Sequence, residues 1–82
     1  MNRELWELVK AFIEAALSSE HTYTVYSEEL IARFGLNYKF YDDMQIYAKE
    51  DRVDFEFESP NYKPDMPSLG FDIIFKKNTA KE

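Results

Sequence analysis

The sequence predicts a small α+β domain, and three hydrophobic patterns lead to this prediction. Apolar side chains recur at helical spacing over residues 2–18. Two shorter helical segments follow, with Gly35 between them. Apolar and acidic side chains then alternate over residues 51–58, and a second β-prone run covers residues 71–77. Helices followed by two paired strands favour a small antiparallel sheet covered by three helices.

The 82 residues are enough for one hydrophobic core. We therefore expect a single domain over residues 1–77 and a disordered tail over residues 78–82. The apolar runs are too short to span a bilayer, and acidic residues near the start interrupt any signal-peptide core. A soluble cytoplasmic protein is the resulting expectation.

The first helix is predicted over residues 2–18, with Trp6 at the edge of its apolar stripe. The stripe itself contains Leu5, Leu8, Val9, Phe12, Ile13, Ala16 and Leu17. Because the stripe is wide, a homodimer formed through this helix is an alternative to simple packing on the domain's own core. Residues 23–26 favour a short edge strand. His21, the single histidine, is expected to be a solvated loop residue, since no second histidine exists to share a metal.

Residues 27–49 predict two helices joined by a tight turn. Ser27 is expected to cap the first helix with its hydroxyl, and Gly35 to end it in a left-handed conformation. Asn37 is expected to cap the next helix, over residues 38–49. Helical periodicity turns four of its residues inward: Phe40, Met44, Tyr47 and Ala48. The outward face then carries Tyr38, Asp42, Gln45, Ile46 and Lys49, with Lys39 and Tyr41 at its margins.

The segment over residues 51–58 has the two-residue period of a strand with one buried face. Val53, Phe55 and Phe57 point to one side, and the acids point to the other: Asp54, Glu56 and Glu58. The loop over residues 59–70 contains all three prolines, which stiffen it: Pro60, Pro64 and Pro67. Phe71, Ile73 and Phe75 form the inner face of the last strand, over residues 71–77.

In the order of its elements the chain resembles the winged helix-turn-helix superfamily. The resemblance is carried by Glu29–Leu36 (ELIARFGL), by Phe40 and Met44 as later core positions, and by a hairpin opening at Asp51-Arg52-Val53. It implies that the third helix enters the major groove and that a wing loop, Asn61 to Leu69, contacts the DNA backbone. The base-contacting side chains implied by the resemblance are Tyr38, Lys39, Asp42, Gln45, Ile46 and Lys49. This chain departs from that pattern, because the helix carries adjacent Asp42 and Asp43 and no arginine.

The charge balance favours a protein partner over DNA. Ten basic and sixteen acidic residues give a net charge of −6, whereas a domain that grips duplex DNA normally presents positive charge. No cysteine, phosphate-binding loop or nucleophile–base constellation is present in the sequence. We therefore predict a non-enzymatic protein without a cofactor or metal.

The predicted partner-binding residues combine acids with exposed aromatic and apolar side chains. They are Tyr38, Asp42, Asp43, Ile46, Asp54, Glu56, Glu58, Tyr62 and Met66. The acids are expected to attract a basic, nucleic-acid-handling protein and to mimic phosphate charge on it, so that its activity is inhibited or modulated. In size and charge the chain is similar to small acidic inhibitors made by phages and mobile elements.

Three alternatives remain open at this point. The acids can be a solvated face that keeps the protein soluble, and Tyr62 and Leu69 can fold back over the sheet. The chain can also be a dimeric winged-helix regulator that binds DNA. This last alternative requires five lysines to gather on one side: Lys39, Lys49, Lys63, Lys76 and Lys77.

Overall fold

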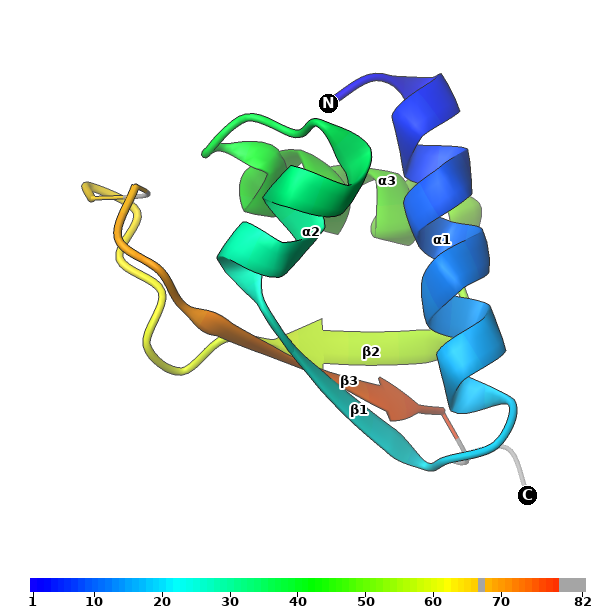
Figure 1. Cartoon of the computed structure of the whole chain (residues 1–82). Coiled ribbons are helices and arrows are strands. Elements are labelled where there is room, and N and C mark those ends of the chain that lie inside the picture. Colours follow the sequence, from blue (N-terminus) through cyan, green and yellow to red (C-terminus); the bar gives the residue numbers. More distant parts are fainter. Residues whose placement is uncertain (67, 79–82) are drawn as a thin grey trace.

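The computed structural model describes residues 1–66 and 68–78. Within them lie α1 (Arg3–Leu17), β1 (Thr22–Tyr26), α2 (Ser27–Phe34), α3 (Phe40–Asp51), β2 (Phe55–Glu58) and β3 (Asp72–Lys77). The helices cover one face of the sheet (Figure 1). The predicted α+β class and order of elements are confirmed. Residue 67 and the predicted tail over residues 79–82 lie outside the described part.

The sheet is antiparallel, with β3 in the centre and the strand order β1-β3-β2. Thr24 of β1 lies opposite Ile74, and Phe57 of β2 lies opposite Phe75. The prediction of an edge strand before the second helix is therefore confirmed. The ladder continues past β3, because the Asn78 N–H donates to the Asp54 carbonyl at 2.9 Å. Asn78, placed in the predicted disordered tail, is therefore held to the sheet.

The core lies between the helices and the inner face of the sheet. Its buried members include Trp6, Val9, Ile13, Leu30, Phe40, Met44, Phe71, Ile73 and Phe75. The prediction for the first helix was wrong at two positions: Leu8 is 55% exposed, and Trp6 is fully buried. The helix is turned so that residues 6, 9, 13 and 17 face the core, which moves Leu8 to the solvent side.

The start of α2 differs from the prediction. The Ser27 hydroxyl does not cap the helix but accepts a hydrogen bond from the Phe71 N–H, and Tyr26 is the N-cap residue. Gly35 ends α2 with φ 68°, as predicted. The Asn37 side chain accepts from the Lys39 N–H at 2.9 Å. However, α3 begins only at Phe40, so the connection is longer than predicted.

The third helix ends at Asp51, and its C-cap residue Arg52 adopts a left-handed conformation with φ 51°. This turn delays the following strand, so β2 starts at Phe55 instead of residue 51. Tyr41, predicted at the margin of the outward face, is buried with its ring edge-on to Phe57 and Phe71. The inward placement of Phe40, Met44 and Ala48 is confirmed.

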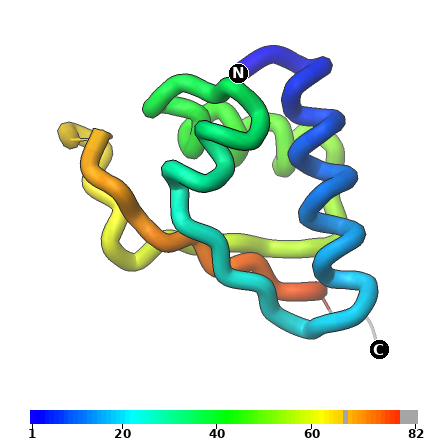
Figure 2. The backbone as a smooth tube through the Cα atoms, in the orientation of Figure 1, coloured from blue at the N-terminus to red at the C-terminus, as the bar shows by residue number. Residues whose placement is uncertain are grey.

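The loop between β2 and β3 extends away from the body, at the end of the sheet opposite to the C-terminal end of α1 (Figure 2). Its base is fixed by two side chains. The Ser59 hydroxyl donates to the Asp72 carbonyl at 2.6 Å, and the Asn61 side chain accepts from the Asp72 N–H at 3.1 Å. The loop therefore leaves the sheet with a defined geometry.

Candidate functional site

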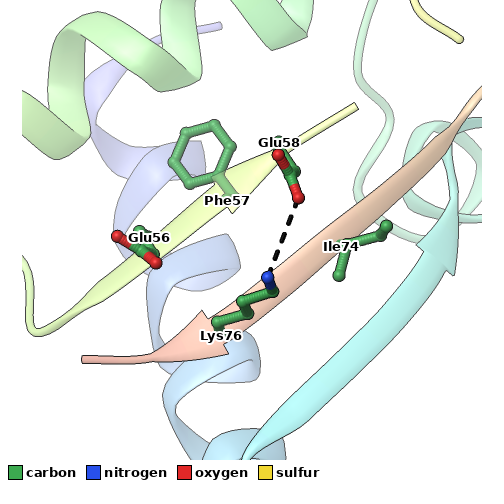
Figure 3. Close-up of a pocket in the computed structure, with 5 residues that line it drawn as sticks. All are labelled: Glu56, Phe57, Glu58, Ile74 and Lys76. Carbon is green, nitrogen blue, oxygen red and sulfur yellow. Dashed lines mark ion pairs between the residues drawn. The ribbon is translucent and has the colours of Figure 1, made fainter. Parts of the chain in front are cut away.

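Two of the predicted acids lie on the face of the sheet that the helices leave uncovered. Phe55 and Phe57 point to the core side of β2, so Glu56 and Glu58 point to the other. They line a shallow hollow of about 220 Å³ together with Ile74 and Lys76 of β3 (Figure 3). The Glu58 carboxylate lies 3.8 Å from the Lys76 ammonium group, whereas Glu56 forms no ion pair with any described residue.

Tyr62 attaches the loop to α3. Its hydroxyl donates to Asp42 at 3.2 Å, and its ring lies 4.7 Å from the rings of both Tyr41 and Phe71. Tyr62 therefore folds back onto the domain, which is the alternative left open by the sequence, and it contributes only part of its surface to any partner. Burial and the negative charge of Asp42 raise the pKa of Tyr62.

The ring of Tyr41 contacts the rings of Phe57 in β2 and Tyr62 in the loop. Burial raises the pKa of Tyr41, and the negative charges of Glu58 and Asp42 raise it further. Asp43 lies elsewhere, because its carboxylate is 2.9 Å from the amino nitrogen of Met1. Asp54 is exposed at the opposite end of β2 from Glu58.

The exposed apolar side chains concentrate near α3 and the loop. Tyr38, Ile46, Met66 and Leu69 are each about half exposed, from 48% to 58%. Ile46 follows Asp42 by one turn, so both occupy one face of α3. Leu69 does not fold back over the sheet as the alternative required. We call Tyr38, Asp42, Ile46, Tyr62 and Met66 the α3–loop surface.

Asp51 has a structural role that sequence reasoning did not identify. It accepts hydrogen bonds from Arg3 at 2.7 and 2.8 Å, from the Trp6 indole N–H at 2.7 Å, and from Lys10 at 3.3 Å. These hydrogen bonds, of which the one from Arg3 has the largest effect, hold the pKa of the Asp51 carboxyl well below its usual range. Arg3, Trp6 and Lys10 lie on one helix face, and this spacing indicates that they share an acidic partner. The sequence does not indicate which acid that partner is.

A homodimer through the first helix, the alternative left open by the sequence, has little exposed apolar surface to use. Val9, Ile13 and Leu17 are buried in the domain's own core, and Leu8 is the large apolar residue of α1 that remains exposed.

No described helix is long and apolar enough to cross a membrane. In the described part of the chain, no three His, Cys, Asp or Glu side chains are grouped so that they could hold a metal ion.

The lysines required for DNA binding do not lie together. Lys63 lies in the loop, which joins the Asp72 end of β3, whereas Lys76 and Lys77 lie at the other end of that strand. Five residue steps along a strand separate the two ends by roughly 17 Å. Lys77 lines hollows beside the C-terminal end of α1.

In a comparison with known proteins, no family model, curated protein or solved structure matches this chain.

Proposed function

We propose that this chain is a non-enzymatic, winged-helix-type binding module that docks on a basic, nucleic-acid-handling protein and modulates it. The observation that carries the proposal is the α3–loop surface. Tyr38, Ile46 and Met66 are exposed, and a tyrosine–aspartate contact ties the loop to α3. Exposed apolar side chains in a polar setting are typical of protein interfaces.

The acids have a separate part in this proposal. Between Phe40 and Asp51 the helix carries four acidic residues and one lysine, and the outer face of β2 adds Glu56 and Glu58. Long-range attraction between these carboxylates and a basic surface accelerates encounter, whereas buried apolar contacts determine how long the complex lasts. Ile46 and Met66 are the anchors in this division of roles.

The alternative, a dimeric DNA-binding regulator, draws support from the order of elements alone. Two observations weigh against it. Asp42, in the first turn of α3, already accepts a hydrogen bond from the loop. Lys76 and Lys77 lie away from the loop, so they do not extend a basic surface around α3.

The experiment that tests the proposal is capture of partners from a native lysate by tagged protein, with and without nuclease, followed by binding kinetics on the captured partner. Ile46→Asp should shorten the lifetime of the complex at least about tenfold, since a charge would be placed in an apolar contact. Glu56→Lys with Glu58→Lys should slow association and reduce its salt dependence.

The matched control is Glu4→Lys with Glu14→Lys, which changes the net charge equally but on α1 instead of the outer face of β2. If this control slows association as much as the β2 variant, the effect is one of total charge and the assignment to β2 is wrong. Recovery of nucleic acid alone, lost after nuclease treatment, would replace the proposal with the DNA-binding alternative.

A further inference from the structure

The outer edge of β1 carries backbone groups that are available for another strand. The His21 carbonyl accepts from the Lys77 N–H, and the Ser27 N–H donates to the Phe71 carbonyl. In an antiparallel pair every second residue bonds to the neighbouring strand. The backbone N–H and C=O groups therefore point toward β3 at residues 21, 23, 25 and 27. They point away from β3 at residues 22, 24 and 26. No described strand pairs with this edge (Figure 1).

The two edges of the sheet differ in how they are protected. An edge strand usually avoids unwanted pairing through charged side chains, prolines or bulges. β2 has Glu56 and Glu58 on its exposed face, whereas β1 reads Thr-Tyr-Thr-Val-Tyr, with no charge and no proline. Threonine, valine and tyrosine are also strong strand formers. β1 is therefore the edge that is open to an added strand.

Acids flank this uncharged strand at both ends. Glu20 precedes β1, and Glu28 and Glu29 follow it in the first turn of α2. All three are exposed, and none forms an ion pair within the described residues. From residue 18 to residue 32 the sequence contains these three acids and no lysine or arginine. The edge therefore attracts a strand with positive charge near its ends.

The same acids disfavour a second copy of this chain at the edge. The symmetric antiparallel register that matches the free backbone groups is centred on Thr24. In this register Glu20 of one copy comes near the first turn of α2, with Glu28 and Glu29, of the other copy, and each copy carries a net charge of −6. Like charges placed opposite one another destabilise a strand pair.

We propose that β1 accepts an extended, basic segment of a partner protein as a fourth strand of the sheet. This inference rests on the proposed function, since it specifies one part of the basic partner. Main-chain hydrogen bonds from Thr22, Thr24 and Tyr26 hold the segment, as in other cases of strand addition. The Tyr26 carbonyl already belongs to the first turn of α2, so at that residue the N–H alone takes part.

The geometry also defines the chemistry of the segment. A strand advances about 3.3 Å per residue, so the acids before and after β1 lie roughly 20–26 Å apart. The segment therefore carries lysine or arginine at two positions separated by about six to eight residues, with strand-forming residues between them. Like β1, it is free of proline in this stretch, because its N–H groups are needed as donors.

The test uses a synthetic peptide of about ten residues, with alternating threonine and valine in the middle and Lys-Arg at each end. The control peptide has the same sequence, with every backbone nitrogen of the middle segment methylated so that neither of its edges can pair with a strand. Backbone amide spectra of the labelled full chain report binding residue by residue. We expect the first peptide to bind at least about tenfold more tightly and to slow hydrogen exchange at Thr24 and Tyr26.

Chain variants complete the test. Thr24→Pro removes an N–H that the sheet does not use, and should abolish peptide binding while the amide spectrum of the core stays unchanged. Thr24→Val retains the N–H and should bind normally. If Thr24→Pro disturbs the fold, Thr24→Lys serves in its place, because it sets a positive charge against the basic peptide.

Three results would overturn the inference: equal binding of both peptides, no binding of either, or a concentration-dependent mass that Thr24→Pro abolishes. Equal binding of both peptides would mean that charge alone attracts them. A concentration-dependent mass would mean that a second copy of the chain occupies the edge. None of these results affects the Ile46→Asp test, so failure of the added strand and failure of the proposed function are distinguishable.

Discussion

Ser27 and Phe71 exchange two hydrogen bonds where β1 passes into α2. The Ser27 N–H donates to the Phe71 carbonyl at 2.8 Å, and the Phe71 N–H donates to the Ser27 Oγ at 3.1 Å. The Ser27 carbonyl belongs to the first turn of α2. Its side chain therefore supplies the acceptor that the backbone would supply in a regular strand, and the sheet continues for one more residue pair.

Replacement of Ser27 by alanine should destabilise the protein by about 1–3 kcal/mol, because the Phe71 N–H would be left without an acceptor in a buried position. Urea unfolding measures this free energy. Ser19→Ala is the control, since its exposed hydroxyl makes one long contact of 3.4 Å, and it should change stability by less than about 0.5 kcal/mol. Equal effects of the two substitutions would contradict the assigned role of Ser27.

Asp51→Asn should lower the melting temperature at neutral pH, because Arg3 and Lys10 lose the charge of their shared partner. Glu50→Gln is the control: this carboxylate is 58% exposed and lies 3.5 Å from Arg3, so its removal should matter little. Thermal unfolding of both variants beside the unchanged protein measures the difference.

The effect of Asp51 should depend on pH in one direction. Its pKa is lowered in the folded protein from the ordinary value of 3.8, so its contribution is present above that pH and is lost as the pH falls toward the folded pKa. The gap in melting temperature between Asp51→Asn and the unchanged protein should therefore be constant near neutral pH and close below about pH 4. A gap that widens in acid would show that the carboxylate does not stabilise the fold.

Gly70→Ala should destabilise the protein because of Tyr26. A β-carbon at this position would collide with the Tyr26 hydroxyl and the end of its ring. Gly70 does not have a positive φ, so the conflict is one of space. Because Tyr26 is 44% exposed and the end of its ring has room to move, we expect a cost of about 1 kcal/mol in the unchanged background and a smaller cost beside Tyr26→Ala. A double-mutant cycle measures this coupling, and additive effects would mean that Tyr26 does not lie over Gly70.

Arg52→Gly should stabilise the protein by roughly 0.5–1 kcal/mol, because a left-handed conformation strains an arginine but not a glycine. A substitution in the opposite sense, at a second left-handed position, provides the comparison. Gly35→Ala introduces the same strain at φ 68° with no atom nearby to clash with the new methyl group, and should cost about 1 kcal/mol. Opposite shifts in melting temperature are expected, and shifts of the same sign would contradict this explanation.

Local patterns in the sequence were sufficient for much of the fold. The alternation through Phe55 and Phe57 depends on neighbours in the chain, and so does the left-handed glycine at residue 35. Both predictions are confirmed. The rotation of a helix about its axis depends on what it packs against, which explains the errors at Leu8 and Tyr41.

Side chains with partners far away in the sequence were harder to predict, because their surroundings come from distant segments. Ser27 has the sequence signature of a helix cap, but its partner lies 44 positions away. In the sequence Asp51 has the features of a surface acid. In the structure it accepts hydrogen bonds from Arg3, Trp6 and Lys10 of α1. Whether Glu56, Ile46 and Met66 bind a partner stays a prediction.

The central position of β3 has a consequence for folding. β1 and β2 each pair with β3 and not with each other, and β3 is the last of the three strands in sequence. During synthesis from the N-terminus, neither of the earlier strands has a neighbour until residues 72–77 emerge. The contact between Thr22 and Lys76 then closes most of the chain into one loop. Formation of the sheet is thus a late event set by long-range contacts, and it should be slow compared with formation of the helices.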